Sequence, residues 1–141
     1  MVKQSTVRVV LADDNEIIRA GIKNLLEKAR DIEGGGEADN GLETLRLVKG
    51  RRPDVLLLDV EMPVLDGIQV TRQLKKRALN TPILILSAYT NREYIREVLA
   101  NGVSGYLIKD EAPEQIVAAV RGIARGERGW VSPQVKAKLV K

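Results

Sequence analysis

The chain contains no cysteine, no histidine and no phenylalanine, and its aromatic side chains are limited to one tryptophan and three tyrosines. Without cysteine it can form neither a disulfide framework nor a thiolate metal site. Without histidine it has no imidazole ligand and no histidine base. A metal in this protein must therefore be a hard cation held by oxygen atoms. The core must be built from leucine, isoleucine, valine and alanine.

Long apolar runs are also missing. No stretch approaches the roughly 18 apolar residues that a membrane span requires, and charged residues interrupt the N-terminal segment where a secretory signal would lie. We therefore expect a cytoplasmic protein without membrane contact. The 141 residues fit one compact domain with a short tail. The net charge of +4 gives only mild support for an acidic partner such as nucleic acid.

Short apolar runs alternate with segments of helical periodicity along the whole chain. The unbroken runs 55–58 and 82–86 are too short for helices and indicate strands buried on both faces. Further strands are predicted at 7–11, 32–38 and 106–108. Helices are predicted at 17–29, 42–50, from 68 onward, around 94–99 and at 113–125, and Asp14 or Asn15 suits the N-cap of the first. Five repeats of strand and helix favour a parallel sheet with helices on both faces.

Two segments fit this pattern poorly. Gly34, Gly35 and Gly36 lie inside the second predicted strand, so that strand is expected to be short, bulged or mobile. Residues 131–141 contain Pro133 and three lysines with little apolar content, which is typical of a tail or linker. The predicted organisation is one domain over residues 1–130 and a tail over 131–141.

Polar side chains follow four of the five predicted strands. Asp13 and Asp14 follow the first strand, Asp59 the third, Ser87 the fourth and Lys109 the fifth. Ligand sites in open α/β sheets form at the carboxyl edge of the strands, so these side chains are expected to converge there. Three clustered carboxylates repel one another, and Lys109 supplies one positive charge. A divalent cation such as Mg²⁺ would neutralise the rest.

A carboxylate beside Mg²⁺ and a lysine can attack phosphorus and form an acyl phosphate. Each residue alone has an ordinary structural interpretation: an acidic pair after a strand is often an N-cap, and a single lysine is usually a solvated surface group. The functional prediction depends on their joint placement at different strand ends.

The sequence motifs resemble the receiver domain of two-component response regulators over about residues 5–130. The matching segments are Val10-Leu11-Ala12-Asp13-Asp14, Leu58-Asp59-Val60-Glu61-Met62-Pro63 with Asp66-Gly67, Ser87-Ala88, and Tyr106-Leu107-Ile108-Lys109. The resemblance implies a flavodoxin-like (βα)5 fold, a doubly wound five-stranded parallel sheet of order 2-1-3-4-5. It also implies a signalling switch rather than an enzyme, one that supports its own phosphorylation and dephosphorylation.

The resemblance assigns a role to each site residue. Asp59 is the expected phosphoacceptor for a histidine kinase, and Mg²⁺ is expected on Asp13, Asp14, Asp59 and the backbone carbonyl of Glu61. Lys109 is expected to contact the carboxylate and then the phosphoryl oxygens.

The same resemblance makes Ser87 and Tyr106 the expected switch pair, in which the hydroxyl moves to the phosphoryl group and the ring turns inward. The small Ala88 is expected to leave the phosphoryl site accessible.

The C-terminal residues are similar to one subgroup of these regulators. Residues 109–114, Ala124-Arg125-Gly126-Glu127 and Trp130-Val131-Ser132-Pro133 resemble the NarL/FixJ class, which carries a LuxR-type helix-turn-helix module after a linker. The implied whole protein binds DNA through that C-terminal domain, which is absent from this chain, and forms a homodimer on phosphorylation. Lys109 is followed by Asp110 where many receivers have proline, a departure that this subgroup shares.

Three other functions stay open. A haloacid-dehalogenase-type phosphatase would use a similar nucleophile, but that family places it after the first strand. A degenerate receiver would act by protein contact alone. Direct nucleic-acid binding has only the net charge in its favour.

Overall fold

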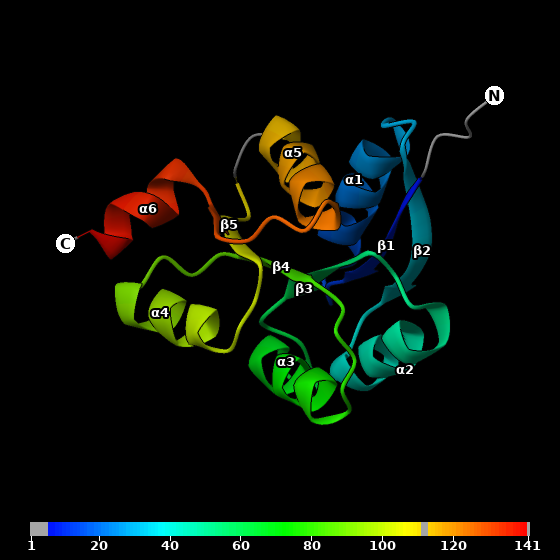
Figure 1. Cartoon of the computed structure of the whole chain (residues 1–141), viewed down its shortest axis with the longest axis horizontal. Helices are drawn as coiled ribbons and strands as arrows, with labels where there is room; N and C mark the ends of the chain where they lie inside the picture. The colour runs from blue at the N-terminus through cyan, green and yellow to red at the C-terminus, as the bar shows by residue number, and fades with distance from the viewer. Residues whose placement is uncertain (1–5, 111–112, 141) are drawn as a thin grey trace.

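The computed structural model describes residues 6–110 and 113–140, in which strands and helices alternate (Figure 1). The strands are β1 (Val7–Ala12), β2 (Ile32–Ala38), β3 (Val55–Asp59), β4 (Ile83–Ser87), β5 (Gly105–Ile108) and β6 (Trp130–Val131). The helices are α1 (Glu16–Glu27), α2 (Gly41–Arg51), α3 (Gly67–Lys76), α4 (Arg92–Ala100), α5 (Pro113–Ala124) and α6 (Pro133–Leu139).

All strand pairs in the sheet are parallel, and the strand order is β2-β1-β3-β4-β5-β6. The predicted order 2-1-3-4-5 is therefore confirmed, and the short β6 extends the sheet beyond β5. Helices α1 and α5 cover one face, while α2, α3 and α4 cover the other (Figure 1). Every residue of β3 and β4 is buried, as expected for central strands with helices on both faces.

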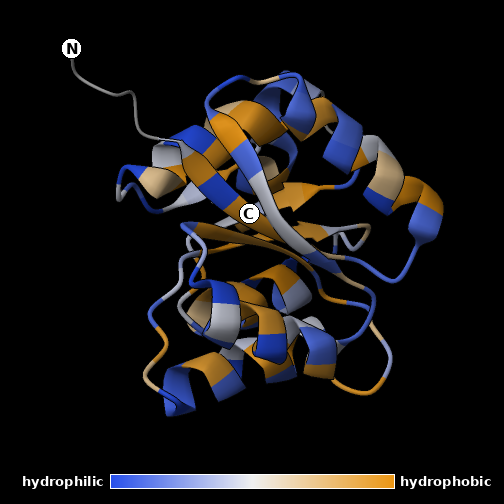
Figure 2. Cartoon of the chain, turned by 90° about the vertical axis from the view of Figure 1, so that its right-hand side faces the viewer, coloured by the Kyte–Doolittle hydropathy of each residue, from blue (hydrophilic) through white to orange (hydrophobic). Residues whose placement is uncertain are grey.

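Side-chain caps fix the first residues of α1 and α3. The Asn15 side chain accepts hydrogen bonds from the backbone N–H groups of Ile17 and Ile18, so Asn15 rather than Asp14 caps α1. Asp66 caps α3 in a reciprocal capping box with Gln69. The hydrophobic strands lie between helices whose outer faces are largely hydrophilic (Figure 2).

The three glycines produce a bulge within a full-length strand. Val9 pairs with Gly34 and Val10 with Gly36, so Gly35 is the extra residue in β2. Gly36 has φ +136°, a conformation that L side chains rarely adopt. The expected bulge is confirmed, but the strand is seven residues long and is not shortened.

The segment predicted to be a tail forms part of the folded body. Residues 130–131 form β6 beside β5, and residues 133–139 form α6, with Ser132 as its N-cap. Val135 is fully buried in the main hydrophobic cluster. The proposed division at residue 130 thus falls inside an ordered strand, and the role of this segment as a link to a further domain stays a prediction. None of the helices in the described ranges is long and apolar enough to cross a membrane.

Candidate functional site

The carboxyl ends of four adjacent strands bring the predicted site residues to one edge of the sheet. Asp13 directly follows β1, Asp59 is the last residue of β3, Ser87 is the last of β4, and Lys109 directly follows β5. These strands are neighbours in the order β1-β3-β4-β5, so residues far apart in sequence become adjacent. The convergence predicted from sequence is therefore present in the structure.

Three carboxylates form a compact cluster at this edge. Asp13, Asp14 and Asp59 each offer an oxygen that lies within 4.8 Å of the others. Asp13 and Asp59 are 1% and 2% exposed, whereas Asp14 is exposed. Two backbone groups orient the buried pair: Asn15 N–H donates to Asp13 Oδ1 at 2.8 Å, and Glu61 N–H donates to Asp59 Oδ1 at 3.1 Å. The expected role of the Glu61 carbonyl as a metal ligand stays a prediction.

Lys109 bridges the two buried carboxylates. Its Nζ lies 3.1 Å from Asp59 Oδ2 and 3.2 Å from Asp13 Oδ2. Burial acts to lower the pKa of Lys109, but the two carboxylates outweigh it, so the pKa is raised and the ammonium stays charged. Among the residues that the structure describes, Lys109 is the one cation paired with these carboxylates, so the cluster keeps an excess of negative charge.

The surroundings of the Asp59 carboxyl disfavour its ionised form. Burial is the main cause that raises the pKa of Asp59 to about 6; Asp13 raises it further, while the Glu61 N–H and Lys109 oppose the shift. Asp59 Oδ2 is buried, and the Lys109 ammonium lies 3.1 Å from it. An all-oxygen donor set and surplus negative charge together suit a small divalent cation.

Ser87 and Tyr106 meet at the backbone of one residue in the loop after β4. Tyr89 N–H donates to Ser87 Oγ at 3.0 Å, and the Tyr106 hydroxyl donates to the Tyr89 carbonyl at 2.9 Å. The Tyr106 ring is 0% exposed, so it points inward in this structure. Burial raises the pKa of Tyr106, and a hydrogen bond with Ser87 partly offsets this. The two predicted switch residues are therefore close together.

Two tyrosines that were not singled out from the sequence stand at the mouth of the site. A hollow of about 470 Å³ is lined by Asp14, Val60, Glu61, Met62, Pro63, Asp66, Tyr89 and Tyr94. The Tyr89 hydroxyl is hydrogen-bonded with the Glu61 carboxylate, which raises the pKa of Tyr89. Its ring lies 4.9 Å from that of Tyr94 between centroids. The only sequence signal was that Tyr89 lies two residues after Ser87, in a loop following a buried strand.

Comparisons with known proteins agree with this geometry. The model of the response regulator receiver domain family matches residues 9–121. The chain is 39% identical over 121 residues to the transcriptional regulatory protein YxjL of Bacillus subtilis (strain 168), covering 86% of this chain and 56% of YxjL. The chain thus spans little more than half the length of this curated relative.

Two solved structures are also similar. The signal receiver domain of the putative response regulator NarL from Mycobacterium tuberculosis is 37% identical with a TM-score of 0.84, covering 87% of this chain and 99% of that one. A LuxR-family two-component response regulator from Aurantimonas sp. SI85-9A1 is 28% identical with a TM-score of 0.89, covering 96% of each chain.

Proposed function

The chain belongs to the response regulator receiver domain family, in the group of LuxR-type transcriptional regulators, and we propose that it is switched by phosphorylation of Asp59. The observation that carries this proposal is the contact of the Asp59 carboxylate with Lys109 inside a cluster of three carboxylates. A receiver domain is not an enzyme in the ordinary sense. This one would receive one phosphoryl group per chain and support its removal by water.

The proposed reaction is an in-line phosphoryl transfer. An Asp59 carboxylate oxygen forms a bond to phosphorus while the bond from phosphorus to the donor nitrogen of a kinase phosphohistidine breaks, and that nitrogen keeps the electron pair. Asp59 is ionised above a pH of about 6, so it is a nucleophile at neutral pH. Lys109 would neutralise charge that develops on the phosphoryl oxygens.

We further propose that the cation of this site is Mg²⁺, held by Asp13, Asp14, Asp59 and the Glu61 carbonyl. When bound, Mg²⁺ would offset the negative charge shared by the carboxylates and the incoming phosphoryl oxygens. The excess of carboxylates over ammonium groups supports this assignment.

The Ser87 hydroxyl is proposed to donate a hydrogen bond to the attached phosphoryl group. Tyr106 is proposed to be its partner in the switch, with the inward ring favoured by phosphorylation. Their common link to the Tyr89 backbone supports a coupled movement of the two side chains.

The partners proposed for the whole protein follow from its family. They are a histidine kinase as phosphoryl donor, a second copy of the protein after phosphorylation, and DNA, bound through a C-terminal domain that lies outside this chain. A cytoplasmic location fits these partners.

The direct test is incubation with acetyl phosphate and Mg²⁺, followed by intact-protein mass measurement. We expect one added phosphoryl group on the wild type, and none on Asp59→Asn or when Mg²⁺ is replaced by a chelator. Equal labelling of Asp59→Asn would show that another residue accepts the group and would overturn the assignment.

A further inference from the structure

The C-terminal segment Trp130–Leu139 attaches to the strand that carries Tyr106. In β6, Trp130 pairs with Gly105 and Val131 pairs with Tyr106. Helix α6 follows at once and contacts both β5 and α4; Figure 1 shows it beside α4 at the end of the sheet. A shift of β5 at Tyr106 would therefore act directly on this segment.

Helix α6 has one fully buried side chain. Val135 is 0% exposed and belongs to the same hydrophobic cluster as Tyr106 and the α4 residues Ile95 and Val98. Leu139 is half-buried, and the other residues of α6 are exposed. A seven-residue helix is too short to be stable alone, even with Ser132 as N-cap and Pro133 in its first turn. Its helical state therefore depends on the packing of Val135, and of Leu139 beside it, against the cluster.

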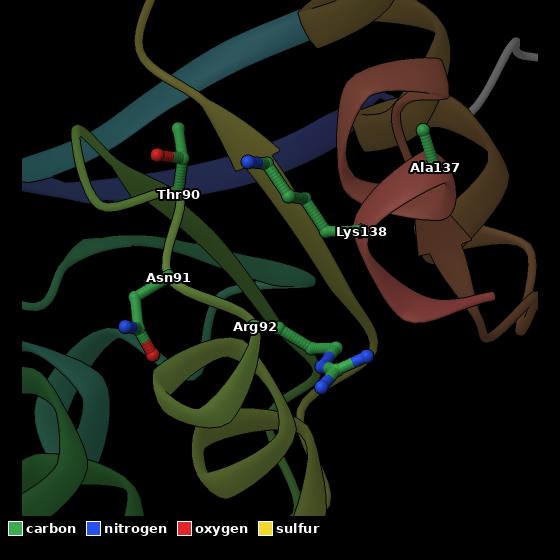
Figure 3. A pocket seen from close by; sticks show the side chains of 5 residues that line it. All are labelled: Thr90, Asn91, Arg92, Ala137 and Lys138. Carbon is green, nitrogen blue, oxygen red and sulfur yellow. The ribbon is translucent and has the colours of Figure 1, made fainter. Parts of the chain in front are cut away.

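The C-terminal half of α6 borders a hollow. A hollow of about 540 Å³ separates it from the loop after β4 and is lined by Thr90, Asn91, Arg92, Ala137 and Lys138 (Figure 3). The Lys138 side chain extends from α6 toward Thr90 across this hollow (Figure 3). Arg96 donates to the Leu139 carbonyl at 3.4 Å, which is long for such a hydrogen bond. Two cationic side chains, Arg92 and Lys138, line this hollow.

The seated position of α6 goes with the inward position of the Tyr106 ring. That ring is fully buried in the hydrophobic cluster that also contains Val135 and the α4 residues Ile95 and Val98. If the ring turned outward, it would leave this cluster, and Val135 would lose part of the surface on which it packs. The inward ring and the docked helix thus stabilise each other.

We propose that Trp130–Leu139 is a conformational latch that docks on β5 and α4 when the Tyr106 ring is inward and detaches when the ring is outward. The latch rests on the proposed function, because phosphorylation of Asp59 would favour the inward ring and so order α6. The phosphoryl signal would thereby set the direction in which the chain leaves the receiver. Coupling of two states through one element is reciprocal, so anchoring α6 must also favour the phosphorylated state.

The first test is hydrogen exchange of residues 130–139 in this chain, with and without Mg²⁺ and beryllofluoride, a phosphoryl mimic. The reporting amides are those of Val135 and Lys136, which donate to the Ser132 side chain and carbonyl. We expect their exchange to slow by about fivefold or more on saturation, as for typical allosteric couplings, and to stay unchanged in Asp59→Asn.

The second test uses the reciprocity. Val135→Ala removes the anchor, while Gln134→Ala changes an exposed neighbour on the same helix and serves as the matched control. We expect Val135→Ala, and not the control, to weaken beryllofluoride binding measured by fluorine NMR by about the same factor. The Tyr106 ring should also become more exposed in Val135→Ala without any ligand, as read from its NMR signals.

The outcomes separate the latch from the function. Saturating beryllofluoride with unchanged exchange in α6 would overturn the latch and leave phosphorylation standing. Failure of the wild type to bind beryllofluoride would count against the proposed function instead. In that case the latch is tested by the exposure of the Tyr106 ring without ligand. Equal exposure of this ring in Val135→Ala and Gln134→Ala would overturn the latch.

Discussion

The Asp59 carboxylate lies where its ionisation destabilises the metal-free fold. Its pKa in the folded chain is about 6, whereas in the unfolded chain it is about 4. The folded state therefore holds this proton more tightly, and stability falls as pH rises through this interval. The contribution of Asp59 is fully favourable below about pH 4 and is lost above about pH 6.

We predict that Asp59→Asn stabilises the chain in the absence of divalent cations, and only at higher pH. The gain in unfolding free energy should be near zero below about pH 4 and reach up to about 3 kcal/mol above about pH 6. Denaturant unfolding with a chelator over this pH range measures it. A gain that is equal at every pH would show that ionisation of Asp59 is not its cause.

The acidic cluster and Lys109 could be located from sequence because each follows a buried strand directly. A strand end in a parallel sheet has a defined edge, so position in sequence implies position in space. Tyr89 could not be found in this way. Its contact with Glu61 depends on the path of two loops, and no periodicity encodes that path.

At the level of elements, the central strands were predictable and the last strand was not. β3 and β4 are unbroken apolar runs, a pattern typical of strands covered on both faces. β6 has only two residues, and α6 has one fully buried side chain among lysines, so neither shows a periodic signal. Both exist because they pack on the completed sheet, which a local pattern does not reveal.

Gly122 leaves space for the Trp130 side chain of β6. A Cβ at Gly122 would lie 2.5 Å from Trp130 Nε1 and 2.6 Å from Glu127 Oε1, two atoms that are themselves hydrogen-bonded at 3.0 Å. Alanine is favoured over glycine inside a helix by up to about 1 kcal/mol, so α5 alone would gain from the change.

We predict that Gly122→Ala nevertheless loosens β6, because the Trp130 side chain must move. Amide exchange in 130–139 should accelerate while exchange in β3 and β4 stays as in the wild type. Gly21→Ala in α1 is a suitable control, since a Cβ there meets nothing within 4 Å. Unchanged exchange in the C-terminal segment would mean that the indole is not held by this contact.

At the scale of the whole molecule, the acidic cluster and Tyr106 lie on one parallel sheet. β4 and β5 are adjacent, and Ser87 and Tyr106 share hydrogen bonds with Tyr89. Asp59 on β3 is therefore connected to the surface formed by α4 and α6 through adjacent strands and the Tyr89 backbone.

We predict that phosphorylation promotes association of two copies through that surface. Sedimentation velocity with Mg²⁺ and beryllofluoride should show a concentration-dependent shift toward a dimer, absent in Asp59→Asn. Identical sedimentation with and without the mimic, at concentrations where the mimic is bound, would remove this claim.

The position of Trp130 has a practical consequence. It is the only tryptophan of the chain, which has no phenylalanine and three tyrosines. It lies half-buried in β6, with its indole N–H donated to Glu127. Fluorescence excited at the long-wavelength edge of absorption therefore comes from one ring at the joint between sheet and C-terminal helix. Trp130 is therefore an intrinsic fluorescent probe of this junction. Motion of the C-terminal segment can be followed in time without an attached dye.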